Sequence, residues 1–125
     1  MTKLLIVDDV REYLDSLSRA LAGEYEVITA TNLEEAKAKV NDRIKLALVD
    51  VRLSEAEATN RDGVSFLLWL KQNYPKVPVI MMSAYSDFDA AMDSLNFGAS
   101  RYLKKPINLR ELKELIKALT KEAQS

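Results

Sequence analysis

The sequence predicts a doubly wound α/β fold in which a parallel sheet of five strands alternates with five helices. Short apolar runs bounded by polar or turn residues recur along the chain, as in strands buried on both faces of a parallel sheet. Segments with one apolar face, typical of amphipathic helices, alternate with those runs five times. With 125 residues and no linker or repeat, residues 1–125 are expected to form a single domain.

The first half of the pattern predicts two strands and two helices. Lys3–Val7 is a short apolar run and predicts the first strand. The first helix is expected over Arg11–Ala22, where leucines recur three and four residues apart. Glu26–Ala30 is expected to be a short second strand. The second helix is expected to begin at Asn32, because Asn32 with Glu35 three residues later forms a capping-box pattern.

The middle of the chain predicts two further strands around one helix. Leu46–Val49 is an apolar run that leads into an aspartate and predicts the third strand. The third helix is expected over Gly63–Asn73, which is rich in leucine. Two prolines then mark the turn into the fourth strand, Val79–Met82.

The last third of the chain predicts two helices around the fifth strand, Arg101–Lys104. The fourth helix is expected to begin near Ser86 and to end at Gly98, a typical residue after a helix. Its apolar residues are expected to face inward; they are Phe88, Met92 and Leu95. The fifth helix begins with a second capping box, formed by Asn108 and Glu111. The chain ends just after this helix, so no output domain is expected.

Composition and charge exclude several classes of function. The net charge of −1 gives no electrostatic reason to expect binding to nucleic acid or to a membrane surface. No apolar run approaches the roughly 20 residues of a membrane span, and no signal peptide is recognisable, so a cytoplasmic location is expected. Cysteine and histidine are both absent, which excludes disulfides, Cys/His zinc sites and a histidine general base. The chain also cannot carry a phosphohistidine.

Four of the expected strands run directly into polar groups that suit phosphoryl chemistry. These groups are Asp8 and Asp9, Asp50, Ser83 and Ala84, and Lys105 and Pro106. The carboxyl ends of parallel strands line one crevice, which is where open α/β sheets bind ligands. Three carboxylates would attract a hard cation, and Mg²⁺ is the one expected. A hydroxyl and an ammonium beside them suit a phosphoryl group.

The order of these groups and their flanking residues resemble the receiver domain of two-component response regulators. The resemblance covers roughly Lys3 to Leu119 and rests on four motifs. They are Leu-Ile-Val-Asp-Asp ending at Asp9, Leu-Val-Asp ending at Asp50, Met-Ser-Ala-Tyr ending at Tyr85, and Phe-Gly-Ala-Ser-Arg-Tyr-Leu-Lys-Lys-Pro-Ile ending at Ile107. The resemblance implies the flavodoxin-like receiver fold, with strand order 2-1-3-4-5.

The resemblance also implies a phosphoacceptor and a metal site. Asp50 would be the nucleophile that holds the phosphoryl group as an acyl phosphate. Asp9 would bind Mg²⁺ directly and Asp8 through water, with the backbone carbonyl of Arg52 as a further ligand. With Mg²⁺ and Lys105 the three carboxylates reach a formal charge of zero, so phosphorylation is expected to require the metal. Taken alone, each aspartate could instead cap a turn or a helix.

Further roles follow from the same resemblance. Lys105 would pair with the phosphoryl group, aimed by a cis bond to Pro106. Ser83 would donate a hydrogen bond to a phosphoryl oxygen, and the small Ala84 would keep the site open. Tyr102 occupies the position of the family's switch aromatic, although a half-buried strand tyrosine is nearly as good an interpretation. Ser83 and Tyr102 together would couple phosphate to the surface of the fourth helix, fifth strand and fifth helix.

Arg52 and Tyr85 are expected to modulate the lifetime of the phosphorylated state. In the receiver fold, the side chains two residues after the acceptor and two after the serine flank the in-line approach of water. Both are large here, and neither carries a carboxylate or carboxamide that could orient a water molecule. Slow self-hydrolysis is therefore expected.

One segment departs from the family pattern. Ser54 stands where the family usually has proline, and the matching glycine is Gly63, so the loop Leu53 to Asp62 is about five residues longer than usual. The loop carries Glu55 and Glu57. It could contact a partner, cover part of the site or be a neutral insertion.

The expected function is a phosphorylation-controlled switch, and not an enzyme beyond its own phosphorylation and dephosphorylation. Its partner would be a sensor histidine kinase or phosphotransfer protein, and its output a domain or partner protein. A homodimer through the fourth helix, fifth strand and fifth helix is one expected form of output.

Three other functions compete with this switch. A receiver-like module that binds partners without phosphate stays open. An aspartyl phosphohydrolase is disfavoured because Arg52 stands where that class needs a second aspartate. A nucleotide- or flavin-binding domain is disfavoured because no GxGxxG or P-loop motif is present.

Overall fold

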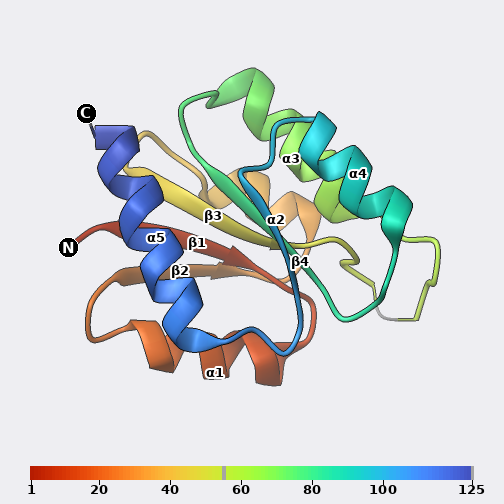
Figure 1. Ribbon diagram of the computed structural model, residues 1–125, viewed down its shortest axis with the longest axis horizontal. Coiled ribbons are helices and arrows are strands. Elements are labelled where there is room, and N and C mark those ends of the chain that lie inside the picture. The colour runs from red at the N-terminus through yellow and green to blue at the C-terminus, as the bar shows by residue number, and fades with distance from the viewer. Residues whose placement is uncertain (55, 125) are drawn as a thin grey trace.

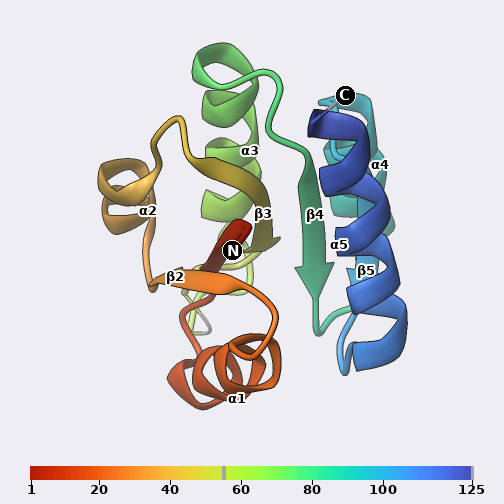
Figure 2. The ribbon, with the colours of Figure 1, turned by 90° about the vertical axis from the view of Figure 1, so that its left-hand side faces the viewer.

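The fold is a five-stranded parallel sheet with helices on both faces (Figures 1 and 2). The computed structural model describes residues 1–54 and 56–124. The strands are β1 (Lys3–Val7), β2 (Glu26–Ala30), β3 (Ile44–Asp50), β4 (Val79–Ser83) and β5 (Arg101–Lys104). Their order in the sheet is β2-β1-β3-β4-β5, which confirms the order that the resemblance implied.

Five helices cover the sheet and alternate with its strands along the chain. They are α1 (Arg11–Leu21), α2 (Leu33–Lys39), α3 (Asp62–Asn73), α4 (Phe88–Asn96) and α5 (Leu109–Gln124). Figure 1 shows α1 and α5 on one side of the sheet and α2, α3 and α4 on the other. The predicted doubly wound α/β class is therefore confirmed.

Two apolar clusters, one on each face of the sheet, hold these layers together. Side chains alternate along each strand, so Leu4 and Ile6 of β1 face α1 and α5, while Leu5 and Val7 face α2 and α3. The strands β1, β3 and β4 are buried on both sides, which explains their continuous apolar runs. Phe66 on α3 is fully buried, and its ring stacks on that of Trp69 with 5.8 Å between centroids.

Polar side chains fix the starts of three helices, as the capping patterns predicted for two of them. The carboxamide of Asn32 accepts a hydrogen bond from the backbone N–H of Glu35 at 2.8 Å. Asn108 accepts one from Glu111 N–H at 3.0 Å. For α4 the cap is Asp87, not Ser86, and its carboxylate accepts from the N–H of Ala90 at 3.0 Å.

The predicted inward face of α4 was wrong. Phe88, Met92 and Leu95 are 76%, 42% and 46% exposed. The helix turns Ala90 and Ser94 toward the protein instead, and both are fully buried. Small side chains let α4 lie close to α3 and β5, which leaves the large apolar residues for the solvent face.

The long segment between β3 and α3 returns the chain close to the end of β3. A Cβ atom on Gly63 would lie 1.8 Å from the backbone oxygen of Asp50, so this approach requires glycine. The carboxamide oxygen of Asn60 fastens the segment by accepting hydrogen bonds from the N–H groups of Leu53, at 2.9 Å, and Asp62, at 3.0 Å. Glu55, which belongs to the predicted long loop, lies outside the described residues.

Within the residues that the structure describes, no helix is both long and apolar enough to cross a lipid bilayer.

Candidate functional site

Three carboxylates meet where β1 and β3 end side by side. Val7 pairs with Val49 in the sheet, so Asp8 and Asp9, which follow β1, lie next to Asp50 at the end of β3. Each of the three offers an oxygen, and these oxygens lie within 4.8 Å of one another. Asp8 is fully buried, and its Oδ1 accepts a hydrogen bond from the N–H of Val10 at 2.9 Å, which fixes its carboxylate. The three side chains therefore lie together at this edge of the sheet, where the sequence analysis expected them.

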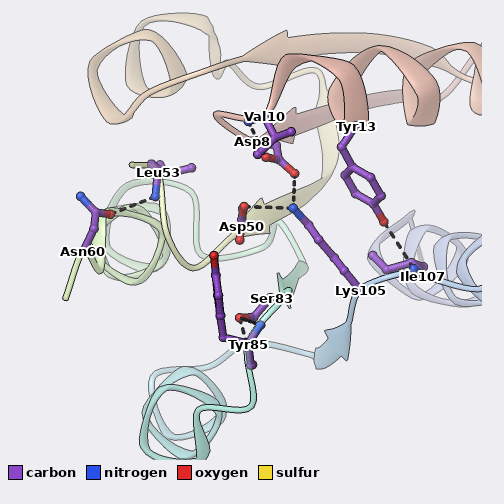
Figure 3. Close-up of polar contacts among 10 residues, drawn as sticks. All are labelled: Asp8, Val10, Tyr13, Asp50, Leu53, Asn60, Ser83, Tyr85, Lys105 and Ile107. Atoms are coloured by element: carbon purple, nitrogen blue, oxygen red, sulfur yellow. Dashed lines mark hydrogen bonds and ion pairs between the residues drawn. The ribbon is translucent and has the colours of Figure 1, made fainter. Parts of the chain in front are cut away.

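The ammonium of Lys105 joins the cluster from the loop after β5. Its Nζ lies 2.6 Å from Asp8 Oδ2 and 3.1 Å from Asp50 Oδ2, and its side chain is only 10% exposed (Figure 3). The Lys105–Pro106 peptide bond is cis, as the resemblance implied. The neighbouring Lys104 donates a hydrogen bond to Ser86 at 2.9 Å and takes no part in the cluster.

Burial makes the charge on Asp50 costly. The pKa of Asp50 is raised to about 7, mainly by desolvation and also by the nearby charge of Asp8, while Lys105 opposes part of this rise. Burial also lowers the pKa of Lys105, but its hydrogen bond with Asp8 and the charges of Asp50 and Asp8 outweigh this effect. The pKa of Lys105 is therefore raised overall, and its side chain stays an ammonium. The cluster thus favours an added cation, which would replace the proton on Asp50.

Ser83 lies at the end of β4 with its hydroxyl already engaged. It donates to the carbonyl oxygen of Tyr85 at 3.2 Å and accepts from the N–H of Tyr85 at 3.1 Å. The hydroxyl therefore holds the turn after β4. It would have to break this pairing to donate to a group on Asp50.

Tyr102 of β5 directs its hydroxyl into the protein. The oxygen is buried and lies next to the side chain of Ser83. Burial raises the pKa of Tyr102, and the side chain of Ser83 lowers it in part. Ser83 and Tyr102, which the sequence analysis paired as a switch, are thus neighbours in the structure.

Arg52 and Tyr85 lie against each other beside Asp50. The guanidinium carbon of Arg52 is 3.6 Å from the centroid of the Tyr85 ring, a cation–π stack. The hydroxyl end of Tyr85 points toward Asp50 (Figure 3). Ala84 is exposed and lines a hollow of about 420 Å³ next to Lys105. The metal role of the Arg52 carbonyl stays a prediction.

Two side chains near the site were missed by sequence reasoning. Tyr13 of α1 faces Lys105, and Arg61 forms ion pairs with Asp87 at 3.0 Å and with Asp93 at 3.8 Å. Tyr13 looks like any residue of an amphipathic helix, and Arg61 stands in a loop of unpredictable path. Neither carries a sequence signal that could have identified it.

The donor set fits a hard divalent cation. The cluster offers carboxylate oxygens, with neither thiolate nor imidazole, and oxygen ligands are those that Mg²⁺ and Ca²⁺ take. Asp9 is half-buried, so one side of the cluster is accessible. The cluster could hold a metal ion such as Mg²⁺.

Comparisons with known proteins agree with this geometry. Residues 4–117 match the family described as the response regulator receiver domain. The chain is 38% identical over 111 residues to the DNA-binding transcriptional regulator NtrC of Escherichia coli (strain K12), an overlap of 89% of this chain and 23% of that protein. It is 34% identical over 119 residues to the response regulator protein PilR of Pseudomonas aeruginosa, covering 91% and 25% of the two chains. The chain thus spans about a quarter of the length of these curated relatives.

Solved structures share the whole architecture. A CheY-like response regulator receiver domain protein from Methanospirillum hungatei JF-1 has a TM-score of 0.88 and 33% identity, covering 99% of this chain and 97% of its own. The receiver domain of NtrX from Brucella abortus has a TM-score of 0.82 and 27% identity, and the match covers 94% of this chain and 98% of that domain's chain.

Proposed function

The chain belongs to the response regulator receiver domain family, and we propose that it is a switch that accepts a phosphoryl group on Asp50. The donor would be the phosphohistidine of a sensor kinase or of a phosphotransfer protein. The observation that carries the proposal is the cluster of Asp8, Asp9 and Asp50 with the Lys105 ammonium within 3.1 Å of two of them.

The proposed reaction moves one phosphoryl group between two nucleophiles. A carboxylate oxygen of Asp50 forms a bond to phosphorus as the bond from phosphorus to the histidine nitrogen breaks, and the histidine takes a proton from solvent. Asp50 must be ionised to attack. Mg²⁺, held by Asp8, Asp9, Asp50 and the carbonyl of Arg52, would neutralise charge on the phosphoryl oxygens.

Lys105 and Ser83 would hold the phosphoryl group after transfer. The Lys105 ammonium already contacts Asp50 and would pair with a phosphoryl oxygen. The Ser83 hydroxyl would leave the backbone of Tyr85 to donate to another oxygen, past the small Ala84. That movement changes the space around the buried hydroxyl of Tyr102, which would carry the signal to α4, β5 and α5.

The proposed output surface includes the exposed face of α4. Phe88, Met92 and Leu95 lie three and four residues apart, so they form one apolar stripe on this helix. We propose that phosphorylation alters this stripe and its neighbours on β5 and α5, and that an output domain, a partner or a second copy binds there.

The deciding experiment is intact mass spectrometry after incubation with acetyl phosphate and Mg²⁺. We expect one added phosphoryl group in the parent protein, and none after Asp50→Asn or with a chelator. Asp15→Asn, which alters an exposed aspartate on α1, should behave as the parent. Equal labelling of the Asp50→Asn variant would overturn the proposal. A parent that takes no phosphoryl group would instead favour a module that binds partners without phosphate.

A further inference from the structure

Tyr13 of α1 contacts the Lys105 ammonium from the side opposite Asp50. The Nζ atom lies 4.4 Å from the centroid of the Tyr13 ring, within the range of a cation–π contact. Figure 3 shows the Tyr13 ring beside the Lys105 chain, on the side away from Asp50. One ammonium thus meets two carboxylates and an aromatic ring.

Tyr13 also touches the backbone that carries this lysine. Its hydroxyl accepts a hydrogen bond from the N–H of Ile107 at 3.4 Å, two residues after Lys105. The tyrosine therefore contacts both the tip of the lysine side chain and the loop that follows β5. Because Tyr13 belongs to α1, it ties this loop to a different element.

The ring contact differs from the ion pairs in one respect. Asp8 and Asp50 are the carboxylates proposed to bind the metal, so their oxygens cannot serve Lys105 alone. The Tyr13 ring attracts the ammonium without using any carboxylate oxygen. It would keep Lys105 in place while those oxygens bind other partners.

Lys105 has space to leave the site if the ring is removed. The hollow of about 420 Å³ beside it is lined by Val10, Tyr13, Ala84, Lys105 and Pro106. The Tyr13 ring forms one wall of this hollow. A smaller side chain at this position would widen the hollow and let the flexible lysine chain reach solvent.

We propose that Tyr13 is a positioning residue that holds Lys105 toward the phosphoryl group on Asp50. This inference rests on the proposed function, because it assigns Lys105 to the phosphoryl group. Tyr13 acts through Lys105 and does not touch the reacting atoms itself.

The test compares Tyr13→Leu with Tyr13→Phe by their affinity for beryllofluoride, a phosphoryl mimic, in the presence of Mg²⁺. Amide shifts in NMR spectra report the binding. We expect Tyr13→Leu to bind about 2- to 30-fold more weakly, the range that a cation–π contact would give. Tyr13→Phe keeps the ring and should stay within about threefold of the parent. The rate of labelling by acetyl phosphate should follow the same order.

A second readout separates positioning from general packing. The Tyr13 ring current should shift the Lys105 Cε protons upfield in the parent and in Tyr13→Phe, and this shift should disappear in Tyr13→Leu. In a Lys105→Met background, Tyr13→Leu should cause no further loss of affinity. Tyr25→Leu removes a half-buried tyrosine that packs against the same apolar cluster, and it should bind beryllofluoride as the parent does.

Three outcomes would count against the inference. The positioning role alone is overturned if Tyr13→Leu binds beryllofluoride as tightly as the parent, or if Tyr13→Leu loses the same affinity when Lys105 is absent. A parent that neither binds beryllofluoride nor becomes phosphorylated overturns the proposed function, and the inference falls with it.

Discussion

Arg52 and Tyr85 are the two large side chains that lie beside the proposed phosphoacceptor. They stack with 3.6 Å between the guanidinium carbon and the ring centroid, so each limits the movement of the other. Hydrolysis of an acyl phosphate on Asp50 needs a water molecule in line with the breaking bond. Neither side chain can orient that water as a carboxylate or carboxamide would.

This stack predicts a long-lived phosphorylated state, and substitution of either side chain should shorten its lifetime. Tyr85→Ala should release phosphate several-fold faster than the parent, because it opens the approach to Asp50. Arg52→Asn should be faster still, because it removes the stack and adds a carboxamide. Phosphate release from protein labelled with acetyl phosphate measures both. Arg110→Asn, an exposed arginine on α5, is the control. Release at the parent rate in both variants would show that these side chains do not control water access.

At the scale of elements, the segment between β3 and α3 is joined to the start of α4. Arg61 forms an ion pair with Asp87 at 3.0 Å, and Asp87 also caps α4 through the N–H of Ala90. Arg61 also forms a second, longer ion pair with Asp93, which lies further along α4. One arginine therefore links the long segment to the helix that carries the apolar stripe.

Removing this arginine should loosen α4. Both partners are more than a third exposed, so the pair contributes little free energy, about 0.2–1 kcal/mol. Arg61→Gln should accelerate hydrogen exchange of the α4 amides, residues 88–96, up to about fivefold. High salt should do the same to the parent. Arg110→Gln, which removes an exposed pair on α5, should leave α4 unchanged. If the α4 amides of Arg61→Gln exchange as in the parent, the link does not hold the helix.

The close approach of α3 to β3 makes a second prediction at this scale. A methyl group on Gly63 would collide with the backbone of Asp50, so Gly63→Ala should destabilise the protein by ~3 kcal/mol. It should also displace the proposed acceptor and slow phosphorylation. Urea unfolding measures the first effect. Gly23→Ala is the matched control, since nothing lies within 4 Å of the added atom. Equal stability of the two variants would contradict this account of the β3–α3 contact.

At the scale of the whole molecule, stability should depend on pH through Asp50. Its pKa in the folded protein, about 7, lies above the ordinary value of 3.8 that holds in the unfolded chain. The folded state therefore binds this proton more tightly. The contribution of this proton to the free energy of unfolding is fully present below about pH 4 and is lost as the pH rises through about 7.

Without metal, the parent should lose about 1 kcal/mol of stability from Asp50 between pH 6 and pH 8. Asp50→Asn should lack this contribution. Mg²⁺ should stabilise the parent more at pH 8 than at pH 6, because binding competes with the proton. Urea unfolding at several pH values, with Mg²⁺ or with chelator, measures both effects. Parallel profiles for the parent and Asp50→Asn would show that the folded site does not raise this pKa.

The sequence predicted the sheet and the carboxylate cluster because both follow from local signals. A buried strand needs a continuous apolar run, and the polar residues after each run must gather at one edge of a parallel sheet. The exposed face of α4 could not be predicted the same way. Periodicity marks an apolar face but not which face packs, and here Ala90 and Ser94 fit the close contact better than Phe88 would. Tyr13 and Arg61 depend on contacts between distant segments, which one sequence does not reveal.

The ion pair between Asp8 and Lys105 joins residues 97 positions apart, and it has a consequence for synthesis of the chain. At about 5–20 residues per second, a ribosome adds Lys105 roughly 5 to 20 seconds after Asp8. Until then, neither Asp8 after β1 nor Asp50 at the end of β3 has the Lys105 ammonium as a partner. The nascent chain therefore cannot form the complete cluster, and the proposed acceptor site is finished only after Lys105 has been added and β5 has joined the sheet.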